Sequence, residues 1–225
     1  MGTSGWSYKE WVGPLYPSGT PSSRMLAAYA QLLSTVEAHN TFRRRPRPPT
    51  LEAWAQAVPP TFRFALKAHV AITHQRELEG VEDRVASFFD SLSPLEERVG
   101  PVLFQLPHRQ PDLDRLDRLL TALPSTPPSA FELGPAWNRP DVLERLDGAG
   151  AALVVVDKDG DEPVLPDVGA VAYVRLRRER YDDEAIARWA ERLADVARSG
   201  RPAFVYLRHD GDPLEAVRLL DAVRA

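Results

Sequence analysis

The feature that most constrains the fold of this chain is a repeated unit, in which a short strand-like run is followed by a stretch with helical periodicity. Seven runs rich in β-branched or aromatic residues predict strands at residues 34–39, 62–68, 99–106, 129–133, 152–158, 170–177 and 202–209. The opening residues Gly2 to Trp6 predict an eighth strand that is very short. The strand starts recur about every 30 residues, which is the length of a βα unit.

Helical stretches separate several of these strands. Apolar residues at helical spacing occupy residues 25–33, 81–92, 113–120 and 186–196. Residues that commonly begin helices precede three of these stretches: Ser22 and Ser23, Pro111 and Asp112, and Asp182 and Asp183. Strands and helices therefore alternate along the chain, which predicts an α/β fold with a parallel sheet.

Eight strand–helix units in 225 residues fit a (β/α)8 barrel, the TIM barrel, with a short or truncated first strand. A doubly wound open sheet is the structural alternative, but the chain lacks the glycine-rich phosphate-binding turn that is typical of that fold. No linker, low-complexity tract or block of like charge divides the sequence. We therefore expect residues 1–225 to form a single TIM-barrel domain.

Charge and composition narrow the range of functions. The formal net charge of −4 at pH 7 argues against nucleic acid as a partner, because nucleic-acid-binding surfaces are basic. The chain has no cysteine, so disulfides and thiolate metal sites are excluded. No apolar run reaches the roughly 20 residues of a membrane span, and the start lacks the pattern of a signal peptide. We expect a cytoplasmic protein that binds a small-molecule ligand and no membrane.

Polar and aromatic residues gather where the predicted strands end. In a TIM barrel the active site is built from the C-terminal ends of the strands and the loops that follow them. Side chains two residues apart on a strand share a face, and three such pairs are Glu37 with His39, Lys67 with His69, and Arg175 with Arg177. The other candidates at strand ends or in the loops after them are Trp6, Tyr8, His74, Gln105, Glu132, Trp137, Asp157 and Arg208.

Each of these residues also has an ordinary structural interpretation. A charged residue near a strand end is more often solvated or paired than catalytic. Five charged candidates at one mouth would cost on the order of several kcal/mol to bury without a ligand or good pairing. They are Glu37, Lys67, Glu132, Asp157 and Arg175. For this set, a ligand site and an internal ion-pair network are both open interpretations.

Four large aromatic residues near the start of the chain follow neither a helical nor an alternating pattern. They are Trp6, Tyr8, Trp11 and Tyr16, set among glycines and prolines. Such a loop can line an apolar wall of a ligand site, or it can pack on itself and close the end of the barrel. The basic segment 43–47 has two interpretations as well, a solvated crossover or a contact for phosphate.

Six stretches carry a resemblance to a known family. They read GTSGWSYKEWVGPLYP (2–17), TVEAHNTFRRRP (35–46), WAQAVPPTFRFALKAHVAITH (54–74), GPVLFQLP (100–107), FELGPAW (131–137) and VAYVRLR (171–177). Over essentially its whole length the chain resembles the DUF72 family, also called YecE-like proteins. The resemblance implies a TIM-barrel fold and implies no defined reaction. It marks as characteristic Trp6, Tyr8, Glu37, Lys67, His74, Gln105, Glu132, Trp137 and Arg175.

The chain departs from the pattern of this family at several polar positions. His39 stands where members usually have Asn, and Arg43 where they have Tyr. The Glu-Phe-Arg-His segment of the fifth strand is here Glu132, Leu133, Gly134 and Pro135, so that an Arg and a His of the family pattern are missing. Arg177 replaces the His of the seventh strand, and Arg208 and His209 replace an Asn pair of the eighth. These departures from the family that the chain resembles imply a different, more anionic ligand for this chain, or a divergent branch of the family.

Two classes of function follow from these residues. In the first, the protein is a hydrolase- or isomerase-type enzyme in which Glu37 and Glu132 act as acid and base, while Lys67 and Arg175 bind an anionic or oxygen-rich substrate. A variant adds a divalent metal held by Glu37, Glu132, Asp157 and His39, although no familiar ligand spacing supports it. In the second class, a non-catalytic protein binds a phosphate or carboxylate through Lys67, Arg175, Arg177 and Arg208.

Overall fold

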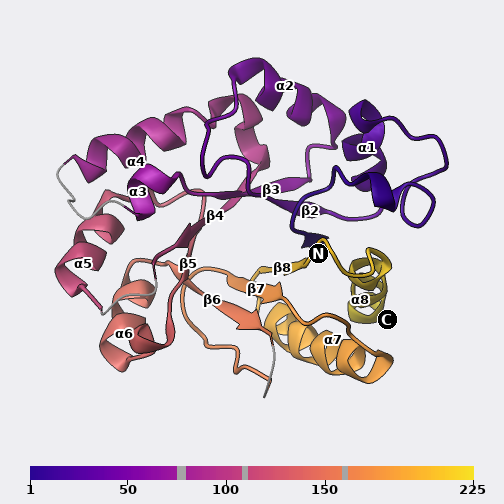
Figure 1. Ribbon diagram of the computed structural model, residues 1–225. Helices are drawn as coiled ribbons and strands as arrows, with labels where there is room; N and C mark the ends of the chain where they lie inside the picture. Colours follow the sequence, from indigo (N-terminus) through magenta and orange to yellow (C-terminus); the bar gives the residue numbers. More distant parts are fainter. Residues whose placement is uncertain (75–79, 108–110, 159–161) are drawn as a thin grey trace.

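The computed structural model describes residues 1–74, 80–107, 111–158 and 162–225, and Figure 1 shows the course of the chain. The strands are β1 (Gly2–Thr3), β2 (Thr35–Ala38), β3 (Arg63–Lys67), β4 (Val99–Gln105), β5 (Ser129–Glu132), β6 (Ala152–Asp157), β7 (Ala172–Leu176) and β8 (Ala203–Leu207). They form one parallel sheet in the order β1-β8-β7-β6-β5-β4-β3-β2. Each predicted strand is present, and its bounds agree within a few residues.

The two ends of this sheet meet. Strand β1 pairs with β8, and directly after β1 Ser4 forms a parallel bridge with Glu37 of β2. The backbone N–H of Gly5 also donates to the carbonyl oxygen of Glu37, with 3.0 Å between N and O. The sheet is therefore a nearly closed barrel, which confirms the predicted (β/α)8 fold and its short first strand.

Helices surround the strands (Figure 1). They are α1 (Ser22–Tyr29), α2 (Pro48–Ala57), α3 (Val70–Thr73), α4 (Val81–Asp90), α5 (Leu113–Ala122), α6 (Pro140–Gly148), α7 (Asp183–Arg198) and α8 (Leu214–Arg224), with short 3-10 helices η1 (Lys9–Trp11), η2 (Ser93–Arg98) and η3 (Pro135–Trp137). The part of the β6–β7 connection that the structure describes, residues 162–171, contains no helix. Within the described ranges, no helix is long and apolar enough to cross a membrane.

Helix starts follow the sequence signals in two cases and depart from them in a third. The side chains of Asp112 and Asp182 accept backbone N–H bonds at the starts of α5 and α7, as their positions predicted. At α1 the N-cap is Pro21, and Ser22 lies inside the first turn. Helix α1 ends at Tyr29, four residues before the predicted stretch ends, and Leu32 is exposed.

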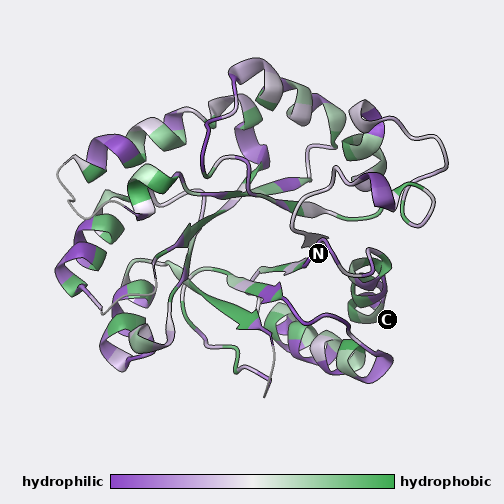
Figure 2. Cartoon of the chain, in the orientation of Figure 1, coloured by the Kyte–Doolittle hydropathy of each residue, from purple (hydrophilic) through white to green (hydrophobic). Residues whose placement is uncertain are grey.

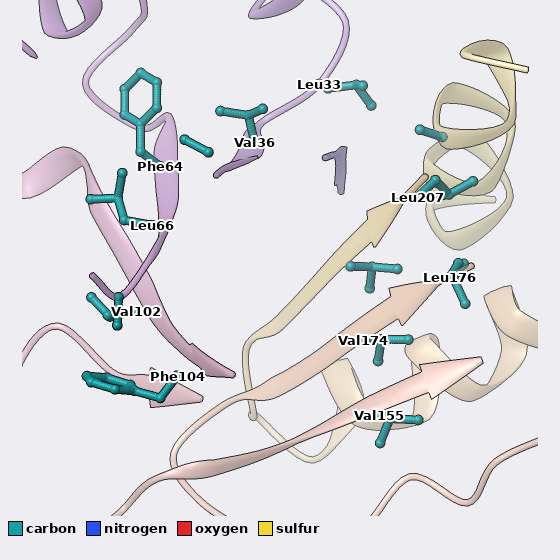
Figure 3. Close-up of a cluster of buried hydrophobic side chains, with 14 of the residues drawn as sticks. Leu33, Val36, Phe64, Leu66, Val102, Phe104, Val155, Val174, Leu176 and Leu207 are labelled. Atoms are coloured by element: carbon teal, nitrogen blue, oxygen red, sulfur yellow. The ribbon is translucent and has the colours of Figure 1, made fainter. Parts of the chain in front are cut away.

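Two layers of apolar side chains fill the fold. The outer layer lies between strands and helices, and Figure 3 shows part of it, including Val36, Leu66 and Val102. The inner layer lies within the barrel, where alanines of β3, β5 and β6 face the larger Tyr173 and Tyr206 of β7 and β8. In Figure 2 strand β6 is mostly hydrophobic, whereas α4 and α5 each carry hydrophobic and hydrophilic residues. This is the pattern of strands buried on both faces beneath amphipathic helices.

Candidate functional site

The mouth of the barrel is organised around the carboxylate of Glu37 at the end of β2. Its side chain is fully buried. Oε1 accepts hydrogen bonds from Ser4 Oγ at 2.7 Å, Arg177 Nη2 at 2.9 Å and Arg175 Nη2 at 3.2 Å, while Oε2 accepts from the Tyr173 hydroxyl at 2.6 Å. Burial by itself would raise the pKa of Glu37, but Arg175, His39 and Arg177 together hold it well below the usual range. Glu37 is therefore ionised.

His39 rests on this carboxylate. Its Nε2 lies 2.7 Å from Glu37 Oε1, as expected for residues two apart on one strand face. Because an ionised carboxylate only accepts, Nε2 is the donor and carries the proton. The Nδ1 atom has no hydrogen-bond partner among the residues that the structure describes. The side chain is 41% exposed, so the ring is fixed on one side and open to a ligand on the other.

Two arginines of β7 connect the strands at the mouth. Arg175 binds Glu37 through Nη2 and Glu132 through Nη1. Arg177 donates to Ser4 Oγ at 2.7 Å and to the carbonyl oxygen of Tyr206 at 2.8 Å, besides its bond to Glu37. Burial lowers the pKa of Arg175, but the neighbouring Glu37 and Glu132 carboxylates outweigh burial and raise it. The predicted same-face pair of Arg175 and Arg177 thus lies on one buried carboxylate.

A second chain of hydrogen bonds crosses β3, β4 and β5. Lys67 Nζ donates to Gln105 Oε1 at 2.5 Å, and Gln105 Nε2 donates to Glu132 Oε1 at 2.6 Å. The Lys67 ammonium also lies 4.2 Å from the centre of the Phe42 ring. Burial and the charge of Arg175 lower the pKa of Lys67, against the opposing effect of Glu132 and Glu37. Lys67, Gln105 and Glu132 are therefore linked in one hydrogen-bonded chain at the ends of three neighbouring strands.

Asp157 does not join them, and its predicted convergence with Glu37 and Glu132 is wrong. Its carboxylate accepts from Arg178 Nε at 2.8 Å and from Trp189 Nε1 of α7 at 2.9 Å. The alternation along β6 turns Val154 and Val156 toward the barrel interior, so the last residue of the strand faces the helix layer instead. Asp157 is buried there as a link between β6 and α7.

Three further candidates are held by local hydrogen bonds or by the apolar core. His69 caps α3, its Nδ1 accepting from the backbone N–H of Ala71 at 3.2 Å. His74 pairs with Thr73 Oγ1 at 2.8 Å and contacts the edge of Phe42. Trp137 is buried in the main apolar core. The sequence alternation that paired His69 with Lys67 fails because the chain leaves the strand and begins a helix at Val70.

A cavity of about 390 Å³, here called the cationic cavity, opens at the ends of β5 to β8. Its charged lining residues are Glu132, Lys158, Arg175, Arg177, Arg208 and Asp210. Arg208 forms a two-pronged ion pair with Asp210, at 2.5 and 2.6 Å. Cationic side chains therefore outnumber carboxylates in this lining. Lys158 was not among the predicted site residues, although its position at the end of the predicted sixth strand indicated a place at the mouth.

A smaller cavity of about 250 Å³, here called the aromatic cavity, lies between the loops after β1 and β2. Trp6, Ser7, Tyr8 and Asn40 contribute to its lining. Ser4 and His39 line both cavities. The two spaces therefore adjoin at these residues.

The four opening aromatic residues divide between the two predicted roles. Trp11 and Tyr16 are buried in the core, and the Tyr16 hydroxyl donates to the carbonyl oxygen of Trp6 at 2.5 Å. Trp6 packs edge-on against Trp54 of α2, and Tyr8 stacks on His209 with ring centres 4.8 Å apart. Burial, with Glu10 and Asp210, raises the pKa of Tyr8 to about 12. Part of the loop packs on itself, and Trp6 and Tyr8 line the aromatic cavity.

The divalent metal that the enzyme hypothesis could include has no set of ligands among the residues that the structure describes. Among those residues, no three His, Asp or Glu side chains are grouped so that they could hold an ion. Of the four residues expected to supply ligands, Glu37 already accepts from two guanidinium groups, and Asp157 faces α7.

Comparisons with known proteins agree with this architecture. The family model described as "Protein of unknown function DUF72" matches residues 1–225. The protein YecE of Escherichia coli is 33% identical over 107 residues, which are 48% of this chain and 37% of the relative. YunF of Bacillus subtilis is 31% identical over 113 residues, 48% of this chain and 39% of the relative. The matches thus span less than half the length of these curated relatives.

Solved structures share the fold at low sequence identity. A crystal structure of a DUF72 family protein from Thermotoga maritima superposes with a TM-score of 0.85 at 23% identity, covering 99% of this chain and 98% of that one. One from Enterococcus faecalis gives 0.81 at 19% identity, covering 100% and 94%. With the family match over its whole length, the chain belongs to the DUF72 family.

Proposed function

We propose that this protein is an enzyme of the hydrolase or isomerase type, which performs acid–base chemistry on a small anionic ligand at the mouth of the barrel. The observation that carries the proposal is the Glu37–His39 pair, 2.7 Å apart, beside a cavity rich in cations. An imidazole that a carboxylate fixes through one nitrogen presents its other nitrogen for proton transfer.

We assign the proton transfer to His39 rather than to Glu37. Glu37 is buried, ionised and surrounded by donors, so its role is to orient the His39 ring and to fix the proton on Nε2. The family pattern has Asn at this position, so the assignment concerns this chain and not the family as a whole. Glu132 lines the cationic cavity, as Asp210 does, so a carboxylate other than Glu37 can contact a ligand there.

The cationic side chains of the cavity are the groups that would bind an anion. Arg175, Arg177 and Arg208 border the space, and Lys158 forms no ion pair with any described residue. The volume of about 390 Å³ lies in the range of cavities that hold small molecules, about 300–1,000 Å³. The net charge of −4 over the whole chain favours such a ligand over nucleic acid as the partner.

The test compares the rates at which wild type and His39→Gln convert a substrate. Purified protein is incubated with a panel of sugar phosphates and hydroxy acids, and product formation is followed by NMR. We expect the variant to lose about 10²- to 10⁴-fold in rate, the usual contribution of a general acid or base. Its affinity for inorganic phosphate should change much less than its rate, because the cationic side chains of the cavity are kept. Equal rates for the two proteins on a substrate that wild type converts would contradict the role of His39.

A non-catalytic binding protein is the second candidate. The observation in its favour is that arginines already neutralise both Glu37 and Glu132, which leaves a positive cavity and few free carboxylate oxygens. Under this alternative the wild type binds phosphate or carboxylate compounds and converts none of the panel. Binding without turnover would therefore favour the second candidate over the first.

A further inference from the structure

The two cavities at the mouth differ in chemistry and adjoin at His39 and Ser4. From this arrangement we infer that the ligand has two parts, a phosphate group in the cationic cavity and a neutral, hydroxyl-bearing ring of sugar size in the aromatic cavity. The inference rests on the proposed function, because it names the class of substrate for the same site.

The phosphate half follows from where the cations lie. Arg177 comes directly after β7 and Arg208 directly after β8, and the loops after these two strands often bind phosphate in TIM barrels. Guanidinium groups attract phosphate, and a phosphate here would compete with Asp210 for the two donors that Arg208 uses in its ion pair. Lys158, at the end of β6, adds an exposed ammonium without an ion-pair partner in the described residues. A phosphate offers these donors more charge and more oxygen atoms than a carboxylate does.

The ring half follows from the lining of the aromatic cavity. Apart from the shared His39, none of its lining residues is charged. The side chains of Ser7 and Asn40 offer hydrogen-bonding groups, and Trp6 and Tyr8 offer apolar ring surface. A sugar presents the same combination, hydroxyl groups around the edge and C–H faces. A second anion would find no counter-charge in this space.

A pair of stacked rings forms a side wall that runs from one cavity to the other. Tyr8, which lines the aromatic cavity, stacks on His209, which lines the cationic cavity. The Tyr8 hydroxyl is engaged with the carbonyl oxygen of Ser4 at 2.8 Å. His39 therefore lies beside the part of the ligand that joins ring and phosphate, and this is where proton transfer would act.

The test compares binding of matched probes to the full chain by calorimetry. The probes are inorganic phosphate, glucose, glucose 6-phosphate, fructose 6-phosphate and ribose 5-phosphate, with glucuronate as the carboxylate counterpart. We expect at least one sugar phosphate to bind about tenfold or more tightly than phosphate, since the tethered ring adds its own contacts. Asn40→Ala should weaken only sugar phosphate binding, whereas Lys158→Ala should weaken both.

Two substitutions serve as matched controls. Asn138→Ala and Lys9→Ala change exposed residues of the same types outside both linings, and should leave every affinity unchanged. If phosphate binds but no sugar phosphate binds more tightly, the two-part ligand is wrong while the anion site stands. Tighter binding of glucuronate than of the sugar phosphates would overturn the phosphate assignment. If no anion binds, the proposed function falls together with this inference.

Discussion

Glu37 keeps a negative charge inside the barrel, where a lone carboxylate would be costly. Two guanidinium groups, a serine, a tyrosine and a histidine surround it. Such a cluster contributes little when complete and costs much when one partner is removed, because the other charges stay buried. The charge of Glu37 is thus a condition for the geometry of His39 and of the β7 arginines.

Glu37→Gln tests this dependence. The substitution leaves Arg175 and Arg177 with one carboxylate fewer, and we expect the free energy of unfolding to fall by about 3–5 kcal/mol. Urea denaturation of wild type and variant measures the difference. Glu10→Gln, at an exposed position, is the control and should unfold like wild type. Unfolding midpoints that do not differ between wild type and Glu37→Gln would contradict the role assigned to the charge.

The stability of the protein should also depend on the protonation of Glu37 at low pH. The folded-state pKa of Glu37 lies well below its ordinary value of 4.5, so the ionised group stabilises the fold fully above about pH 4.5. This contribution is lost as pH falls from there through the folded-state pKa. We expect the stability of wild type to decline with acid below pH 4.5, and more steeply than that of Glu37→Gln. Parallel pH profiles for the two proteins would show that another carboxylate dominates acid unfolding.

Strand β6 and helix α7 show how one residue can look functional and yet hold two elements together. Asp157 has the position of a site residue, at the end of a barrel strand, but it binds Arg178 and Trp189 on the outer face. The part of the β6–β7 connection that the structure describes has no helix. Asp157 therefore adds a polar link between β6 and α7 to the apolar contacts of the buried face of that helix.

Asp157→Ala should separate stability from binding. Removal of a buried carboxylate that accepts two hydrogen bonds leaves both donors unsatisfied, and we expect a loss of about 2–4 kcal/mol in unfolding free energy. Phosphate affinity, measured by calorimetry below the unfolding transition, should not change. Asp83→Ala, at an exposed position in α4, is the control. A selective loss of phosphate binding with unchanged stability would show instead that Asp157 belongs to the ligand site.

The elements also show what the sequence could predict. Strands that are buried on both faces are rich in β-branched residues. The order of the strands along the chain and the barrel could therefore be predicted from the sequence. Period two correctly paired Glu37 with His39, and Arg175 with Arg177, because both pairs lie on regular strand or its immediate continuation. The same rule does not say which face points inward, so it could not distinguish Asp157 from Val156. Nor could it foresee that α3 begins at Val70 and removes His69 from the strand.

For the molecule as a whole, we propose that residues 1–225 act as one domain. The sheet runs through all eight strands, and its two edges meet at Ser4 and Glu37. We therefore expect one cooperative unfolding transition in urea, with coincident curves from circular dichroism and tryptophan fluorescence. Trp6, Trp54 and Trp189 report from different parts of the barrel. Separate transitions for the two signals would show that the barrel comes apart in pieces.

The contact between Tyr8 and His209 joins the first and the last strand–helix units of the chain. Both cavities take residues from the loop after β1, and the cationic cavity also needs the loop after β8. A growing polypeptide on the ribosome therefore cannot complete the cationic cavity until strand β8 and the loop after it have emerged and docked. Capture of an anionic ligand would in this sense report that the first and the last strands of the barrel have come together.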